Sequence, residues 1–307
     1  MNGRTNLTPA AARLADRLAT GQVVLMDGGT GTEMERVGVP MVDGAWCGCG
    51  TITHPDLVQA VHESFIGAGA EVIAANTYAS SRHVMEQVGE GDRFEEANRS
   101  ALAVAIAARE ATNATHVAVA GSMSPTNQYR EVPPVSVTAP NYREQALILE
   151  DAGADLLLVE MLRDAEHSIA LLDGARATGL PIWMGWSAFR DDDGDLTTAW
   201  NDKSLARYMV EVGTEGVDAV MLMHTEQSEM ADGLDLVDQI AGDLPRGAYA
   251  QSGGFIPPNW VFEDVVPPAV YTGYAMGWIE RGVQIVGGCC GITPDHIAHL
   301  RKALDHR

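Results

Sequence analysis

The sequence predicts an α/β protein that folds as a single-domain (β/α)8 TIM barrel. Three observations support this: eight short runs of β-branched or aliphatic residues, amphipathic helical stretches between them, and glycine-containing turns. Such alternation is typical of repeated βα units around a parallel sheet. At 307 residues the chain is longer than an average domain, but barrels of this class commonly form one unit. We therefore assign residues 1–307 to one domain.

The expected strands are spaced so that a helix fits between each one and the next. They lie near Val23–Met26, Val72–Ala75, Val117–Gly121, Leu156–Glu160, Ile182–Trp186, Ala219–Met223, Gly247–Ala250 and Gln284–Gly287. Gly69, Gly153 and Gly282 each precede one of these strands, and we expect each to end a helix in the left-handed conformation. Eight parallel strands of this length close naturally into a barrel.

The main alternative is an open, doubly wound sheet that binds a dinucleotide. The first strand ends in Asp27-Gly28-Gly29-Thr30-Gly31-Thr32, which could form a glycine-rich phosphate loop. This segment lacks the third glycine of a dinucleotide fingerprint, and no strand ending in an acidic residue follows at the expected distance. The barrel is therefore favoured.

Composition restricts the partners and the location of the protein. A formal charge of −22 argues against nucleic acid or an anionic membrane as a partner, because both would repel the chain. The N-terminus lacks the apolar core of a signal peptide, and no apolar run reaches about 18 residues, so we expect a soluble, cytoplasmic protein. A homo-oligomer is left open. The four cysteines form two close pairs, which favours metal or redox chemistry over a disulfide framework.

Polar side chains at the carboxyl ends of barrel strands converge on one mouth, where barrel enzymes carry out catalysis. These ends supply Asp27, Asn76, Thr77, Ser122, Glu160, His224, Gln251, Ser252, Cys289 and Cys290. A buried carboxylate needs a partner, and a substrate ammonium group would suit Asp27 and Glu160. Asp27 could instead cap the following helix or bond the Gly-Gly turn. We predict substrate contacts from Asp27, Gly28, Asn76, Glu160 and Ser252.

The segment Gly287-Gly288-Cys289-Cys290-Gly291 is the most informative part of the sequence. Two adjacent cysteines among glycines pack poorly as core, and a permissive backbone can direct both sulfurs inward. A catalytic zinc site uses thiolate and imidazole ligands and keeps one position open. His224, after an apolar run, is predicted to be the third ligand beside Cys289 and Cys290. The alternatives are that the cysteines are small buried hydrophobes and that His224 only caps its strand by hydrogen bonding.

Five segments, in order along the chain, indicate a known family. They are Leu25-Met26-Asp27-Gly28-Gly29-Thr30-Gly31-Thr32-Glu33-Met34, His54-Pro55-Asp56-Leu57-Val58, Gly69-Ala70-Glu71-Val72-Ile73 with Asn76-Thr77-Tyr78, Gly153-Ala154-Asp155-Leu156-Leu157-Leu158-Val159-Glu160, and Gly287-Gly288-Cys289-Cys290-Gly291 with Pro294-Asp295-His296-Ile297. On these segments the chain resembles the zinc-dependent homocysteine S-methyltransferases, which include betaine–homocysteine and S-methylmethionine–homocysteine methyltransferases. The resemblance implies a barrel in which three cysteines hold zinc and the acceptor sulfur takes the fourth place. It also implies that Asp27 and Glu160 hold the amino end of homocysteine.

The chain departs from the family pattern at several positions. Cys289 and Cys290 match family ligands directly, but Met223-His224 stands where the family usually has Asn-Cys. Either the site is Cys2His, which zinc accepts, or the metal is lost. Gln251-Ser252-Gly253-Gly254 replaces an Asn-Ser-Gly segment that an acidic residue follows. Cys47 and Cys49 lie in a predicted loop where the family rarely has cysteines, and we expect surface thiols there in preference to a donor-site feature.

The implied reaction is a direct displacement that converts homocysteine to methionine. Zinc lowers the pKa of the acceptor thiol, and the thiolate attacks a methyl group on a sulfonium or quaternary ammonium donor. Trp46, Tyr78, Trp186 or Trp278 could contact the cationic donor, and no organic cofactor is required. Three alternatives stay open: a different thiol acceptor, a zinc hydrolase, and a non-catalytic barrel that binds an amino acid.

Overall fold

The computed structural model describes residues 7–125, 131–198 and 203–306, and its centre is an eight-stranded parallel sheet. In sheet order the strands are β1 (Val24–Leu25), β12 (Ile285–Val286), β9 (Arg246–Gln251), β8 (Ala219–Glu226), β5 (Ile182–Ser187), β4 (Leu156–Leu162), β3 (Ala118–Met123) and β2 (Val72–Ala75). A parallel bridge between Met26 and Val72 joins the two outer strands. The sheet therefore closes, and the predicted barrel and all eight predicted strands are confirmed.

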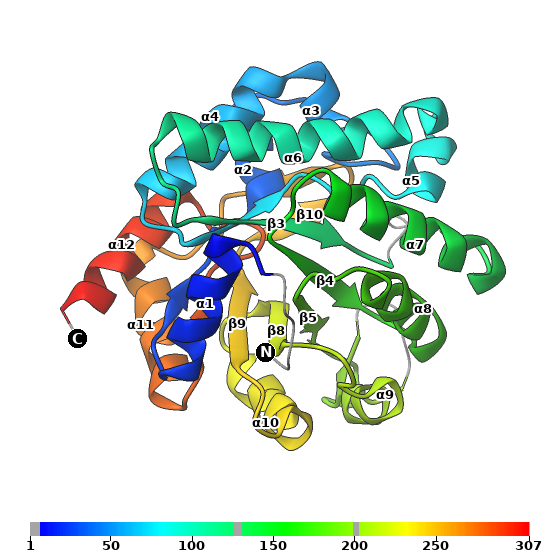
Figure 1. The fold of residues 1–307 in the computed structure, drawn as a ribbon. Helices are drawn as coiled ribbons and strands as arrows, with labels where there is room; N and C mark the ends of the chain where they lie inside the picture. The colour runs from blue at the N-terminus through cyan, green and yellow to red at the C-terminus, as the bar shows by residue number, and fades with distance from the viewer. Residues whose placement is uncertain (1–6, 126–130, 199–202, 307) are drawn as a thin grey trace.

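Helices surround the strands, as Figure 1 shows. The longer ones after α1 are α4 (Pro55–Gly67), α6 (Phe94–Ala111), α7 (Val135–Asp151), α8 (Ala165–Arg176), α9 (Leu205–Val212), α10 (Met230–Ala241), α11 (Pro268–Glu280) and α12 (Pro294–Asp305). Shorter turns of helix are α2 (Thr30–Arg36), α3 (Gly50–Thr53), α5 (Arg82–Gln87) and the 3-10 helix η1 (Gly91–Arg93). No helix in the described part of the chain is long and apolar enough to cross a bilayer.

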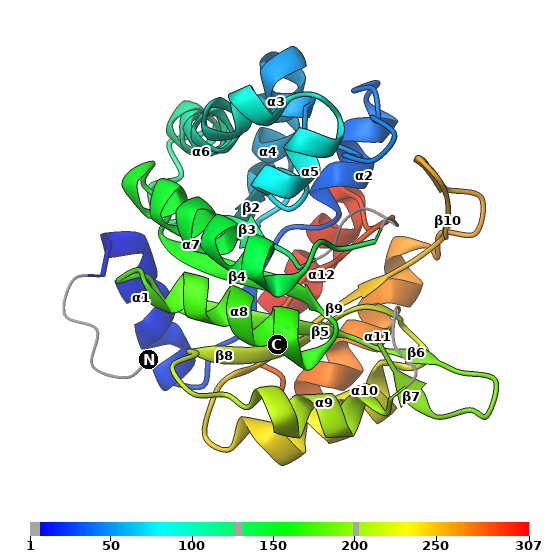
Figure 2. The ribbon, with the colours of Figure 1, turned by 90° about the vertical axis from the view of Figure 1, so that its right-hand side faces the viewer.

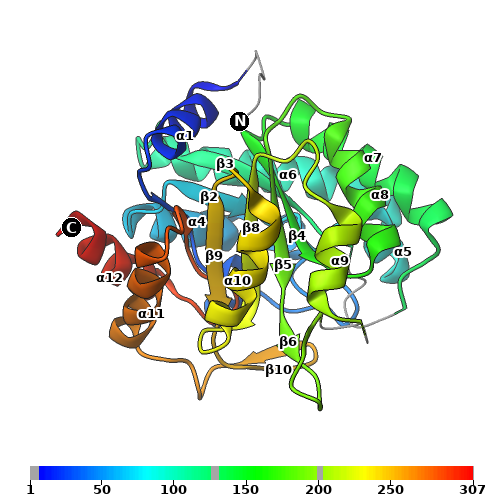
Figure 3. The ribbon, with the colours of Figure 1, turned by 90° about the horizontal axis from the view of Figure 1, so that it is seen from below.

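The two ends of the barrel differ. Helix α1 (Pro9–Ala19) lies at the end where the strands begin, and its Leu14 and Leu18 pack with the residues that fill the barrel interior. At the opposite end lie two antiparallel hairpins, as Figures 2 and 3 show from two directions. They pair β6 (Phe189–Arg190) with β7 (Leu196–Thr197) and β10 (Gly254–Ile256) with β11 (Asn259–Val261). Strands of two or three residues show no periodicity, so neither hairpin is visible in the sequence.

The same three-residue pattern precedes every second strand of the barrel. It consists of a glycine, a small or aliphatic residue, and then an acidic residue or glutamine. The four copies are Gly69-Ala70-Glu71, Gly153-Ala154-Asp155, Gly216-Val217-Asp218 and Gly282-Val283-Gln284. All four glycines have φ between +71° and +100°, a region that other residues rarely adopt, so the expected left-handed turns at Gly69, Gly153 and Gly282 are confirmed.

The acidic residues of this pattern fix the register of neighbouring strands. The backbone N–H of Asp155 donates to the carbonyl of Val119 over 2.8 Å, and the N–H of Val119 donates to Oδ2 of Asp155 over 2.8 Å. Glu71 forms the same two bonds with Leu25, and Asp218 forms them with Ile182. A slip by one residue would turn every side chain of a strand to the other face. These paired bonds therefore hold the strand ends in the register that forms the mouth.

Candidate active site

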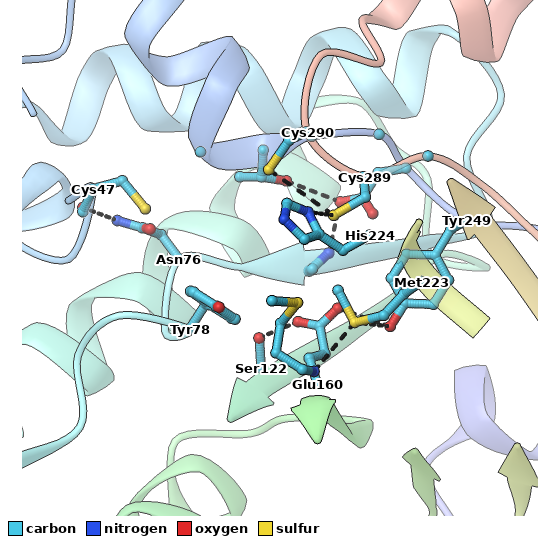
Figure 4. A pocket seen from close by; sticks show the side chains of 18 of the residues that line it. Cys47, Asn76, Tyr78, Ser122, Glu160, Met223, His224, Tyr249, Cys289 and Cys290 are labelled. Carbon is cyan, nitrogen blue, oxygen red and sulfur yellow. Dashed lines mark hydrogen bonds between the residues drawn. The ribbon is translucent and has the colours of Figure 1, made fainter. Parts of the chain in front are cut away.

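A cavity of about 410 Å³ opens among the carboxyl ends of the barrel strands. It brings together most of the side chains that the sequence analysis placed at strand ends, as Figure 4 shows. The members of this group that line it are Asp27, Asn76, Ser122, Glu160, His224, Cys289 and Cys290, and the predicted substrate contact Gly28 lines it too. Thr77, Gln251 and Ser252 are not among the lining residues.

The side chains of His224, Cys289 and Cys290 form a compact cluster of possible metal ligands. Sγ of Cys289 lies 3.4 Å from Nδ1 of His224 and 4.0 Å from Sγ of Cys290, and all three ligand atoms lie within 4.8 Å of one another. A tetrahedral zinc ion with ordinary bond lengths separates two sulfur ligands by about 3.8 Å and a sulfur from a nitrogen by about 3.5 Å. The donor set and its spacing therefore fit a zinc ion with one position left for a substrate.

Close backbone packing holds the cysteine pair in place. The N–H of Cys289 donates to the carbonyl of Ala250, and the carbonyl of Cys290 accepts from the N–H of Ser252, each over 2.9 Å. Gly291 has φ +79°, and a Cβ there would lie 1.9 Å from the carbonyl oxygen of Ser252. Only glycine allows this approach, so Gly291 lets the cysteine segment dock against the end of β9.

His224 reaches the cysteines because β8 is irregular at its end. The pairing of β8 with β9 shifts register between Met223 and Glu226, and His224 has φ +43°, which is unusual for a residue with a side chain. The hydroxyl of Thr225 donates to the carbonyl of Met223 over 2.8 Å and stabilises the irregular turn. Strained conformations of this kind concentrate at functional sites. The position of His224 at a strand end is visible in the sequence, but this kink is not.

Asp27 is a buried carboxylate with only partial support from the protein. Its Oδ2 accepts from the N–H of Ala74 over 2.7 Å and from the hydroxyl of Thr30, at the start of α2, over 3.2 Å. Burial is the main cause that raises the pKa of Asp27 to about 7, and the charge of Glu160 raises it further. Asp27 therefore bonds the start of the helix and also faces the cavity as a group that a nearby cation would stabilise in its charged form.

Glu160 is also buried and is held by two hydroxyl groups. Ser122 donates to its Oε2, and Tyr249 donates to its Oε1 over 3.0 Å. Burial raises the pKa of Glu160, and these two hydrogen bonds oppose that shift. Tyr249 lies within β9, where its alternating pattern resembles ordinary core, so the sequence analysis did not identify it. A Cβ on Gly185 would lie 2.6 Å from the Tyr249 hydroxyl, so the glycine in β5 makes room for it.

Asn76 and Ser252 support neighbouring segments. The amide nitrogen of Asn76 donates to the carbonyl of Cys47 over 2.9 Å and to the hydroxyl of Thr51 over 3.1 Å. The hydroxyl of Ser252 accepts from the N–H of Val266 over 2.9 Å. Asn76 therefore holds the Cys47 loop beside the cavity, whereas Ser252 lies behind the cysteine segment.

The expectation of surface thiols at Cys47 and Cys49 is wrong. Cys47 is 2% exposed and lines the cavity, and burial raises the pKa of its thiol to about 12. Cys49 is also buried and packs in a small apolar cluster away from the barrel interior. The loop folds inward because Val42 pairs with Trp46 in a tight turn, which the sequence did not indicate.

Aromatic side chains form part of the cavity lining. Trp46 and Tyr78 contact each other edge to face, with ring centroids 6.2 Å apart. Trp186 and Trp278 instead pack in the apolar layer between strands and helices, so the interpretation that they could contact a donor is wrong. Trp260 and Phe255, which the sequence analysis did not select, line the cavity from the β10–β11 hairpin.

The sequence matches a known protein family along most of its length. A family model described as homocysteine S-methyltransferase matches residues 24–304. The chain belongs to the homocysteine S-methyltransferase family. The family assignment made from the sequence motifs is confirmed, and with it the expectation of an S-methyltransferase enzyme.

Individual relatives are distant but similar over most of their length. The selenocysteine Se-methyltransferase of Brassica oleracea var. italica is 25% identical over 94% of this chain and 90% of its own. Betaine–homocysteine S-methyltransferase 1 of Bos taurus is 25% identical over 95% of this chain and 74% of its own. The metallated form of the Escherichia coli homocysteine methyltransferase MmuM superposes with a TM-score of 0.76 at 24% identity, covering 94% of this chain and 99% of that one. This last similarity supports the barrel fold.

Proposed function

We propose that this family member is a zinc-dependent enzyme that transfers a methyl group from a sulfonium or quaternary ammonium donor to the thiol of homocysteine, giving methionine. The observation that carries the proposal is the cluster of His224, Cys289 and Cys290, whose ligand atoms lie within 4.8 Å of one another at the barrel mouth. Family membership supports the reaction class. The fitting donor set favours Cys2His ligation over loss of the metal.

In this proposal His224, Cys289 and Cys290 hold the zinc ion. When bound, zinc would act as a Lewis acid that lowers the pKa of the acceptor thiol and favours its thiolate. Two thiolates and a neutral imidazole leave the ligand set one negative charge short of three thiolates. We therefore expect the acceptor thiol to deprotonate more easily here than beside three cysteines, and its sulfur to attack less strongly.

Asp27 and Glu160 bind the ammonium group of the acceptor. Both carboxylates are buried and line the same cavity as the cysteines, and burial raises the pKa of each. An ammonium group nearby would return both to the charged form and replace the missing solvent. Gly28 and Asn76 line the same wall and are proposed as further substrate contacts. A substrate contact from Ser252 stays a prediction. Its hydroxyl accepts a hydrogen bond from the N–H of Val266, and the residue does not line the cavity.

The donor lies against the aromatic part of the cavity lining. The rings of Trp46 and Tyr78 can attract a cation by about 0.5–2 kcal/mol, and both line the cavity. The acceptor sulfur attacks the methyl carbon as the bond from carbon to the positive sulfur or nitrogen breaks. The donor then leaves as a neutral thioether or tertiary amine, and no organic cofactor is consumed.

A second candidate is the same chemistry with another acceptor. His224, in place of the third family cysteine, is expected to weaken the attack of a bound thiolate, so an acceptor atom that is a stronger nucleophile than sulfur would suit this site. The similarity to a selenocysteine Se-methyltransferase makes a selenol the first alternative to test. A non-catalytic amino-acid-binding barrel would hold a ligand without transferring a methyl group.

Four further expectations stay predictions. They are the cytoplasmic location, a homo-oligomeric state, the absence of nucleic-acid and membrane partners, and the extension of one domain over residues 1–307.

The test combines metal analysis with a methyl-transfer assay. The purified chain is incubated with homocysteine or selenocysteine and with S-methylmethionine or betaine, and the methylated product and the bound zinc are quantified. We expect one zinc per chain and transfer that Cys289→Ser and Cys290→Ser abolish together with the metal. Cys49→Ser, at a buried cysteine outside the cavity, is the matched control and should retain both. A wild-type protein without zinc, or zinc retained in both variants, would overturn the proposal.

A further inference from the structure

The imidazole of His224 contacts two aromatic rings, one from each of the two hairpins at the barrel mouth. Its ring centroid lies 6.0 Å from that of Phe189, at an interplanar angle of 62°, and 6.1 Å from that of Trp260, at 57°. A histidine binds a metal through one nitrogen in the plane of its ring, so the direction of that ring decides whether the bond can form. At His224 the usual means of fixing a ring, a regular strand, is absent because the backbone is kinked.

Trp260 is itself fixed at its backbone and at its ring. Its N–H donates to Oε2 of Glu35 in α2 over 3.0 Å, and the neighbouring Asn259 amide donates to Oε1 of the same carboxylate over 2.7 Å. Its indole N–H donates to the carbonyl of Ser252 over 3.1 Å. Trp260 is only 6% exposed, so its ring has little freedom to move.

The Ser252 bond connects Trp260 to the other half of the ligand cluster. The N–H of Ser252 donates to the carbonyl of Cys290, and a Cβ on Gly291 would lie 1.9 Å from the Ser252 carbonyl oxygen. A continuous series of short contacts therefore runs from the cysteine segment through Ser252 to the indole ring, and from there to the imidazole. Through it, the place of the third ligand is set relative to the first two.

We propose that Trp260 is a positioning residue for the metal ligand His224, and that its ring directs the imidazole toward Cys289 and Cys290. This inference rests on the metal site proposed above. A thiolate has no ring plane to orient, so a cysteine at position 224 would not need this support. Trp260 is therefore tied to the histidine and not to the metal site in general.

The test measures Co²⁺ binding in two backgrounds, because Co²⁺ substitutes for Zn²⁺ and reports its ligand geometry in visible absorption. Trp260→Leu is placed in the wild-type chain and in His224→Cys, and affinity is measured by competition with a chelator. In the wild type we expect Trp260→Leu to weaken binding by about 10- to 100-fold, the usual effect of losing a residue that orients a ligand, and to change the visible bands. In His224→Cys the same substitution should change affinity by less than about twofold.

Two further variants separate positioning from folding. Trp260→Phe keeps a ring beside His224 but loses the bond to Ser252, so we expect a smaller loss than with leucine. Ile256→Ala shortens an apolar side chain of the same hairpin that is 68% exposed and does not line the cavity, and should leave Co²⁺ affinity unchanged. An equal loss from Trp260→Leu in both backgrounds, or no loss in the wild type, would overturn the inference while the metal site stands. A wild-type chain that binds no Co²⁺ would overturn the metal site as well.

Discussion

Nδ1 of His224 lies 3.4 Å from Sγ of Cys289, a residue 65 positions away in the sequence. If this contact marks a metal site, His224→Ala should lower zinc affinity by at least about tenfold, because it removes a ligand outright. His224→Cys should retain the metal, since three thiolates are an accepted zinc ligand set. Zinc content after dialysis against a graded chelator measures both. Retention of full zinc by His224→Ala would contradict the assignment.

The hydroxyl of Tyr249 donates to Oε1 of Glu160 over 3.0 Å inside the cavity. Removing it with Tyr249→Phe should raise KM for the acceptor by about tenfold, because a hydrogen bond to a charged group contributes about 1.5–3 kcal/mol. Zinc content should not change. Steady-state kinetics with varied homocysteine provide the measurement. Tyr142→Phe, at a buried tyrosine in α7 that does not line the cavity, is the control, and an equal rise in KM there would exclude a specific role for Tyr249.

The raised pKa of Asp27 makes stability depend on pH. Burial raises this pKa from 3.8 to about 7 in the folded chain, whereas the unfolded chain keeps the ordinary value. The folded state therefore holds a proton that the unfolded state has lost, and stability falls as pH rises between these two values. Below that window both states are protonated, and above it both are charged.

Asp27→Asn removes this contribution, so the metal-free variant should lose less stability than the wild type between about pH 4 and pH 7. The midpoints of urea unfolding at several pH values measure the difference, and parallel curves for the two proteins would contradict it. Because the two chains share every other titrating group, a difference in how their urea midpoints depend on pH is caused by Asp27.

The sequence predicts the barrel well because its strands are short apolar runs, each separated from the next by a helix. The same logic places Asp27, Glu160, His224 and the cysteine pair at one mouth, since carboxyl ends of parallel strands must meet there. The glycines that precede alternate strands are also visible in the sequence, and in the structure they have positive φ, as at Gly153. These features depend on local pattern and on the general geometry of barrels.

The missed features depend on contacts between distant segments. Trp260 contacts His224 because Glu35 holds the backbone of Trp260. Glu35 and Trp260 are far apart in the sequence. Cys47 is buried because a loop folds inward, and no periodicity in that loop indicates burial. Tyr249 resembles core until Gly185 on another strand makes room for its hydroxyl. Such features appear only when side chains from several strands are placed together.

Asp155 provides the last prediction, at the end of the barrel opposite the cavity. Its Oδ2 accepts from the N–H of Val119 and from Nη1 of Arg109, each over 2.8 Å, and its side chain is 5% exposed. Asp155→Ala leaves a buried N–H and a partly buried guanidinium without this partner, so we expect a loss of about 3 kcal/mol in the free energy of unfolding.

The matched control for Asp155 is another aspartate paired with an arginine, on the surface. Asp173 lies 2.8 Å from Nη1 of Arg176, but its side chain is 65% exposed. Asp173→Ala should therefore cost less than about 1 kcal/mol, because solvent screens such a pair. Urea unfolding of the two variants compares them directly. Zinc affinity should stay unchanged in both variants, because neither aspartate lines the cavity. If Asp155→Ala were no more destabilising than Asp173→Ala, the paired bonds between strands would not be what holds the barrel in register.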